Sequence, residues 1–158
     1  SVSSRIFRAE LLTGSGDFRG ALEAIAVLRR ATSLPANTAA LDAIELDALI
    51  GISDRAAAEA LVARMAKSLG EGSAAFASHR ARFLFAFGQE GEALDLLAPA
   101  IAASPDSPQL LMTLVDLVAR GRAEPSPELA SSAGAAAERA LDLSHYAEPR
   151  LYAAFARL

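Results

Sequence analysis

Apolar residues recur along this chain with the spacing of one helix face, in segments that glycines and prolines separate. The clearest segment is residues 88–105, GQEGEALDLLAPAIAASP, with a glycine at a turn, a small residue and a leucine, an apolar stripe and a closing proline. Residues 16–35 repeat this order. The matching positions are Gly16, Ala21, Leu22 and Ile25 in the first copy and Gly88, Ala93, Leu94 and Leu97 in the second. Such repetition predicts a helical solenoid, an architecture that mostly provides binding surface.

The chain breakers and the apolar periodicity together predict four helix pairs. Their expected ranges are about 3–13 and 17–32, 37–51 and 54–69, 73–87 and 90–103, and 107–120 and 127–143. Asn37, Asp54 and Ser73 are expected N-caps, because short polar side chains accept bonds from the first free helix amides. β-branched residues form no alternating run, so no sheet is expected.

The expected fold class is therefore all-α, a right-handed α-solenoid of antiparallel helix pairs. We interpret residues 1–158 as one repeat domain, with units of about 2–36, 37–72, 73–106 and 107–146 and the start of a further helix at 147–158. The link GRAEPS, residues 121–126, is expected to be a loop inside the fourth unit. A finished solenoid usually closes with a polar capping helix. The apolar ending RLYAAFARL is therefore expected to mark a fragment of a longer repeat protein.

The segments resemble the tetratricopeptide repeat family, in which small and large apolar residues alternate at set distances around a glycine turn and before a closing proline. The third unit matches at Ala81, Leu84, Gly88, Ala93, Leu97, Ala100 and Pro105, and the first at Ala9, Leu12, Gly16, Phe18, Ala21 and Ile25. Ser53 stands where the second unit should have glycine, and no unit has the early tryptophan. The resemblance implies a superhelix that binds ligands on its concave face. Other repeats of two helices remain open as alternatives.

Composition narrows the functional class. Hydrophobic residues make up 53% of the chain but aromatic residues only 6%, so alanine and leucine dominate, and small side chains allow close helix packing. The net charge of -4 is spread along the chain without a basic stripe, which disfavours nucleic acid. Charged residues interrupt every apolar stretch before the roughly 18 residues that a membrane span requires. A soluble protein without cysteine is expected, which fits cytoplasm and periplasm equally.

No arrangement of residues points to catalysis. The chain has no P-loop, no GxSxG, no HExxH and no cysteine nucleophile, so we expect no enzymatic activity, cofactor or metal. Asp42, Glu45 and Asp47 form the densest acidic group, which is expected to be a solvated face or one side of a binding groove. Ala93 and Ala100 are expected to lie buried where helices cross.

The first helices of the pairs are expected to line the binding face. In the third unit, Ser78, Arg82 and Phe85 form one helical stripe there. The charged positions of the other units are Glu10, Asp47 and Asp116. We therefore expect a protein-binding or peptide-binding scaffold or adaptor, in a bacterial setting. The alternatives are a non-catalytic regulatory or substrate-positioning domain of a larger enzyme or envelope or secretion assembly, and self-association through an open carboxyl-terminal end.

Overall fold

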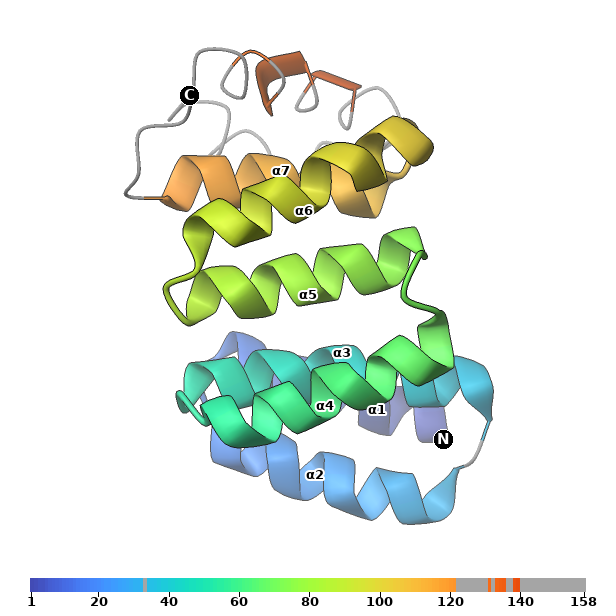
Figure 1. Ribbon diagram of the computed structural model, residues 1–158. Coiled ribbons are helices and arrows are strands. Elements are labelled where there is room, and N and C mark those ends of the chain that lie inside the picture. Colours follow the sequence, from blue (N-terminus) through green and yellow to red (C-terminus); the bar gives the residue numbers. More distant parts are fainter. Residues whose placement is uncertain (33, 122–130, 132, 136–137, 140–158) are drawn as a thin grey trace. The chain divides into compact units, whose positions relative to one another are not determined.

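The computed structural model describes residues 1–121 except 33, together with 131, 133–135, 138 and 139. Within these residues the chain is helical and contains no strand, as the sequence predicts (Figure 1). The main helices are α1 (Val2–Gly14), α2 (Phe18–Ala31), α3 (Pro35–Gly51), α4 (Arg55–Leu69), α5 (Ala74–Ala86), α6 (Glu90–Ala103) and α7 (Pro108–Arg120). Most of the expected helix 127–143, the further helix 147–158 and nearly all of GRAEPS lie outside the described residues.

Side-chain caps set most of the helix starts. Asp17 caps α2 by accepting from the Gly20 amide at 3.0 Å, and Ser73 caps α5 by accepting from the Phe76 amide at 3.1 Å. Asp54 accepts from the Ala57 amide at 3.0 Å, which confirms its expected role. The expectation for Asn37 is wrong. Helix α3 begins at Pro35, where a missing amide proton costs nothing, and Asn37 lies inside the helix and donates to the Thr32 hydroxyl at 3.0 Å.

Three helix hairpins share the same turn. Each turn contains one residue in the left-handed region, with φ of 85° at Gly16, 58° at Ser53 and 85° at Gly88. The amide of the next residue then donates to a carbonyl five positions back, which closes a Schellman-type cap. These bonds run from Asp17 to Leu12 at 2.9 Å, from Asp54 to Leu49 at 3.0 Å and from Gln89 to Leu84 at 2.9 Å. Ser53 thus adopts the conformation that glycine has in the other two hairpins.

Burial repeats in step with these turns. Seven residues before the turn residue lie Ala9, Leu46 and Ala81, and five residues after it lie Ala21, Ala58 and Ala93, all with no exposed surface. The expected burial of Ala93 is therefore confirmed. Ala100 is only half-buried, contrary to expectation. It lies one helical turn beyond Leu97, near the end of α6, where the crossing no longer covers it.

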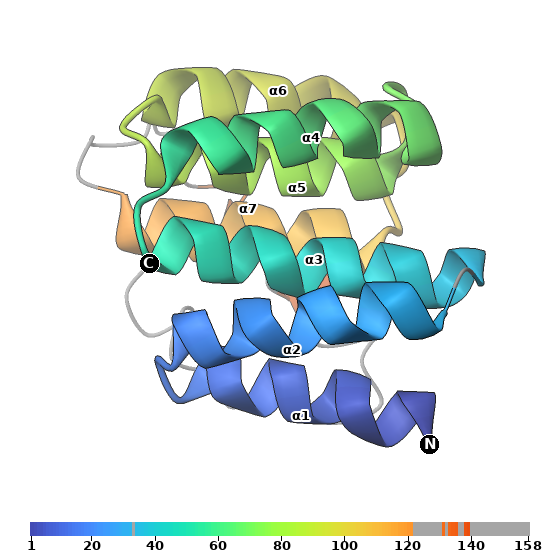
Figure 2. The same cartoon turned by 90° about the horizontal axis from the view of Figure 1, so that it is seen from below.

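The chain divides into two compact units, residues 1–68 and residues 69–158. In the first unit, α3 packs against both α1 and α2. Figure 2 shows α3 beside α2. The core of this unit is apolar and comes from all three helices. Its buried members are Ala9, Ile25, Leu28, Leu41 and Ile44, with Val2, Ile6 and Ala24 packed against them.

The second unit repeats this three-helix arrangement, because α7 packs against both α5 and α6. Helix α7 buries an almost continuous apolar face, formed by Leu110, Leu111, Leu114, Val115 and Leu117. Each unit therefore contains a hairpin of two helices, and the first helix of the next pair covers one side of that hairpin. This is the packing that the sequence periodicity predicts for consecutive helices.

Candidate binding surfaces

The acidic group of α3 is not a solvated face, which corrects the expectation for Asp42 and Glu45. Asp42 is 2% exposed, and its carboxylate accepts from Arg29 of α2 at 2.5 Å and from Arg64 of α4 at 3.0 Å. Glu45, three residues on along the same helix face, accepts from the same two guanidinium groups, at 3.2 Å from Arg64. Two carboxylates and two guanidinium groups thus join α2, α3 and α4 in one ion-pair cluster.

The two carboxylates of the cluster stabilise the positive charge of the half-buried Arg29 side chain. Burial lowers the pKa of the Arg29 guanidinium, but hydrogen bonds and charges from Glu45 and Asp42 outweigh this and raise the pKa above its ordinary value. The Arg29 guanidinium therefore keeps its positive charge near neutral pH. Because each carboxylate accepts from two guanidinium groups, the arrangement is a structural link between α2, α3 and α4. Asp47, the third acid, points from α3 as a half-buried residue.

The expected stripe on α5 divides into a buried and an accessible part. Ser78 is 1% exposed, and its hydroxyl lies 2.7 Å from that of Thr113 on α7. Thr113 donates its own proton to the Gln109 carbonyl at 2.7 Å, so Ser78 is the donor in the pair. Ser78 therefore holds α5 to α7 and does not reach a surface ligand, which removes it from the expected contact residues.

Arg82 and Phe85, the other members of the stripe, are partly exposed. Arg120 at the end of α7 places its guanidinium 5.8 Å from the centre of the Phe85 ring, within the range of a cation–π contact. The same guanidinium forms an ion pair with Asp116, one helical turn earlier. Phe85, Asp116 and Arg120 therefore form a cluster on α5 and α7, which we call the α5/α7 patch. Sequence analysis missed Arg120, although its i, i+4 spacing from Asp116 is a recognisable signal.

Glu10 is exposed on α1, and Asp47 lies on α3, in the first unit. Both helices are first members of their pairs and are in contact with each other. A shared binding face with Glu10 and Asp47 remains a prediction. The structure brings Glu10 and Asp47 to one unit and Arg82, Phe85 and Asp116 to the other.

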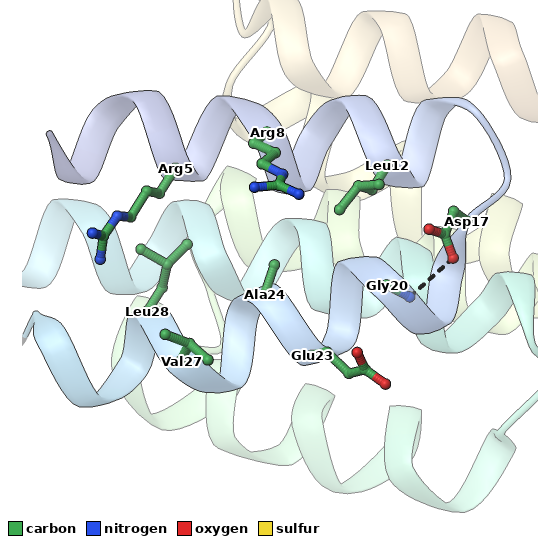
Figure 3. A pocket seen from close by; sticks show the side chains of 9 residues that line it. All are labelled: Arg5, Arg8, Leu12, Asp17, Gly20, Glu23, Ala24, Val27 and Leu28. Atoms are coloured by element: carbon green, nitrogen blue, oxygen red, sulfur yellow. Dashed lines mark hydrogen bonds between the residues drawn. The ribbon is translucent and has the colours of Figure 1, made fainter.

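A groove runs between α1 and α2 in the first unit, with a volume of about 600 Å³ (Figure 3). Its floor is apolar and its walls carry charges of both signs. The lining residues are Arg5, Arg8, Leu12, Asp17, Gly20, Glu23, Ala24, Val27 and Leu28. None of these was expected from the sequence to contact a ligand, because the groove arises where two helices meet and neither helix reveals it alone. The i, i+3, i+7 spacing of Arg5, Arg8 and Leu12 on one face was the available signal.

The described part of the chain contains no group of three or more histidine, cysteine, aspartate or glutamate side chains placed to hold a metal ion. Among the same residues, no helix has the length and apolar character needed to cross a membrane. The features that remain as candidate sites are thus surfaces: the α5/α7 patch and the α1/α2 groove.

No protein-family model, curated protein or solved structure matches this chain. The resemblance to tetratricopeptide repeats consequently remains a prediction from the sequence.

Proposed function

We propose that this chain is a protein-binding or peptide-binding scaffold built as a right-handed, tetratricopeptide-like solenoid. Three hairpins with the same turn and the same buried positions support the repeat architecture. A repeat array provides a pre-ordered surface, so that little conformational entropy is lost when a partner binds.

The observation that carries the proposal is the α5/α7 patch, where an arginine lies over an aromatic ring on accessible helix surface. Arginine and aromatic side chains supply a large share of binding energy in protein interfaces. Asp116 holds the Arg120 guanidinium in place before any partner arrives. The ligand is expected to cover Phe85 and to place an acceptor near Arg82 or Arg120.

A first experiment tests whether this patch contacts a protein in the cell. p-Benzoylphenylalanine replaces Phe85, and in a matched control it replaces Arg80, which lies exposed on the same helix. Irradiation of cells should cross-link a defined partner from position 85 and not from position 80. Cross-links of equal yield from both positions, or from neither, contradict the proposed patch.

Purified partner then allows an affinity measurement. Arg82→Glu should weaken binding by roughly 1–2 kcal/mol, as expected for an interface arginine, whereas Arg80→Glu should leave binding unchanged. Circular dichroism verifies that both variants keep their helical content. Equal affinity of the two folded variants would exclude the α5 face as the binding site.

The alternative, a non-catalytic regulatory or substrate-positioning domain of a larger enzyme or envelope or secretion assembly, uses the same surfaces. It differs in the partner, which is then part of the same assembly. The cross-linked partner from position 85 distinguishes the two: an enzyme or assembly subunit favours the alternative, and an independent protein or peptide favours the scaffold.

A further inference from the structure

The α1/α2 hairpin has two sides. Within the described residues of the first unit, a further helix covers one of these sides and the other side is open. Helix α3 covers the side that carries Ala9 on α1 and Ile25 on α2. The groove lies along the other side, on a face of α1 whose lining residues are turned by about 40° to 100° from Ala9, given the 100° step between helix residues. Leu28 of α2 borders both the groove and the core. A pair of packed helices that accepts a third helix on one side presents a similar ridge-and-groove surface on the other. The geometry therefore fits an α-helix.

The floor of the groove fits the apolar face of such a helix. Leu12, Ala24 and Val27 line it with small and branched side chains, and Val27 is 57% exposed. Within the described part of the chain, the exposed large apolar residues belong to the first unit, and Val27 is the one among them that lines the groove. Exposed apolar surface bordered by charges is typical of an interaction site.

The charges in the groove are separated along its length. In Figure 3, Arg5 lies at one end of the groove and Arg8 near its middle, both on α1, whereas Asp17 lies at the other end and Glu23 lies on α2 between Ala24 and Gly20. Within the described residues, Arg5, Arg8 and Glu23 take part in no ion pair, while Asp17 caps Gly20. A bound partner can therefore pair with both guanidinium groups without displacing an existing partner.

This polarity selects the direction of the bound helix. A helix carries partial positive charge at its amino end and partial negative charge at its carboxyl end. The carboxyl end of the occupant is thus favoured near Arg5 and Arg8, and its amino end near Asp17 and Glu23. The occupant then runs antiparallel to α1, because α1 begins at the end of the groove that holds Arg5.

We propose that the α1/α2 groove binds an amphipathic helix of a partner protein, with an apolar stripe on Leu12, Ala24 and Val27 and acidic residues in its carboxyl-terminal half that pair with Arg5 and Arg8. This surface is separate from the α5/α7 patch, so the two can bind different segments or different proteins. Helix-in-groove recognition is a recurrent mode in which side chains at i, i+3, i+4 and i+7 form the contacts.

The test uses a displayed library of amphipathic helical peptides of about 18 residues, long enough to form a helix, with a constant leucine and alanine stripe and variable charges. Peptides selected on the full chain should carry acidic residues in the carboxyl-terminal half and basic residues in the amino-terminal half. A selected peptide should lose at least about tenfold in affinity against Arg5→Glu/Arg8→Glu. A peptide with its charges exchanged should regain binding to that same variant.

The matched control is Arg19→Glu/Arg30→Glu, which changes the net charge equally at two exposed α2 positions outside the groove lining. It should leave peptide affinity unchanged. Val27→Asp, which introduces a charge on the groove floor without touching either arginine, should also abolish binding. Circular dichroism checks that each variant folds.

Selection of no peptide, absence of a charge preference, or equal loss of affinity in the control would overturn the proposal. If sedimentation shows a wild-type dimer that Arg5→Glu/Arg8→Glu dissociates, the occupant is a second copy of this chain, and the partner helix is wrong. These outcomes are independent of the α5/α7 patch, since Arg82→Glu and the cross-linker at position 85 do not alter the groove. Failure of one surface therefore leaves the test of the other intact.

Discussion

Asp42 and Ala77 occupy the same position in their hairpins, eleven residues before the left-handed turn residue, and both are buried. In the first unit this position holds a carboxylate that receives two guanidinium groups, whereas in the second unit it holds a methyl group. The next residue of α5, Ser78, makes a buried polar contact that is neutral, with the Thr113 hydroxyl of α7. The same turn and the same buried alanine five residues after it, Ala58 or Ala93, therefore support two different kinds of core.

The difference shows which features the repeat requires. Both hairpins have a residue in the left-handed region at the turn and a buried alanine five residues after it, where the two helices approach closely. The polar contacts differ between the two units, and they contribute differently to the free energy of unfolding. Ion pairs removed from water are sensitive to the loss of one partner, whereas a neutral hydrogen bond contributes modestly.

The largest change in the free energy of unfolding is expected when the buried carboxylate of the first unit is removed. Asp42→Ala should lower the free energy of unfolding by about 3 kcal/mol, because it leaves Arg29 half-buried with only Glu45 as partner. Denaturant unfolding followed by circular dichroism measures the effect. Glu59→Ala, at an exposed position of α4, should change stability by less than about 0.5 kcal/mol. A similarly small change for Asp42→Ala would mean that the cluster is not part of the core.

Overpacking of the helix crossing should affect both units alike. Ala21→Leu and Ala93→Leu should each cost about 1–3 kcal/mol, because neither residue has exposed surface and the added atoms must displace neighbours. Ala102→Leu provides the control, since Ala102 is exposed on α6. If one alanine tolerates leucine and the other does not, the two hairpins differ in packing as well as in polar contacts.

The hydrogen bond between Ser78 and Thr113 should contribute less to the free energy of unfolding than the ion-pair cluster does. Ser78→Ala should cost about 1 kcal/mol, because it removes one buried hydrogen bond while Thr113 keeps its bond to the Gln109 carbonyl. The denaturation midpoint of this variant is to be compared with that of Asp42→Ala under the same conditions. A larger loss for Ser78→Ala would reverse the ranking of the two cores.

The smallest expected effect concerns the turn itself. Ser53→Gly should raise the free energy of unfolding by roughly 0.5–1 kcal/mol, because relief of the left-handed backbone exceeds the entropy gained by the unfolded chain. Gly88→Ala should lower the free energy of unfolding by about 1 kcal/mol, because alanine is strained in the left-handed conformation of Gly88. Opposite signs for these two exchanges, measured by thermal unfolding, would establish that the turns are equivalent. A loss of stability in both would show that Ser53 has a further role.

The helices could be predicted from sequence because their signals are local. Apolar residues at helical spacing, capping residues such as Asp54 and Ser73, and the glycines of the turns each act within a few positions of the chain. The start of α3 was the exception, since Pro35 at the first helical position and Asn37 two residues later are both acceptable starts by local rules. Only the observed bond from Asn37 to Thr32 decides between them.

The surfaces could not be predicted in the same way, because they depend on which residues meet across helices. Asp42 and Glu45 look like a solvated acidic face until packing brings Arg29 from α2 and Arg64 from α4 to them. Ser78 fits a ligand stripe by spacing but is covered by Thr113, 35 residues later. The groove likewise exists only where α1 meets α2. Sequence by itself determined the helices and their repeat, through local backbone chemistry; tertiary packing alone decided which polar side chains are paired inside and which remain available to a partner.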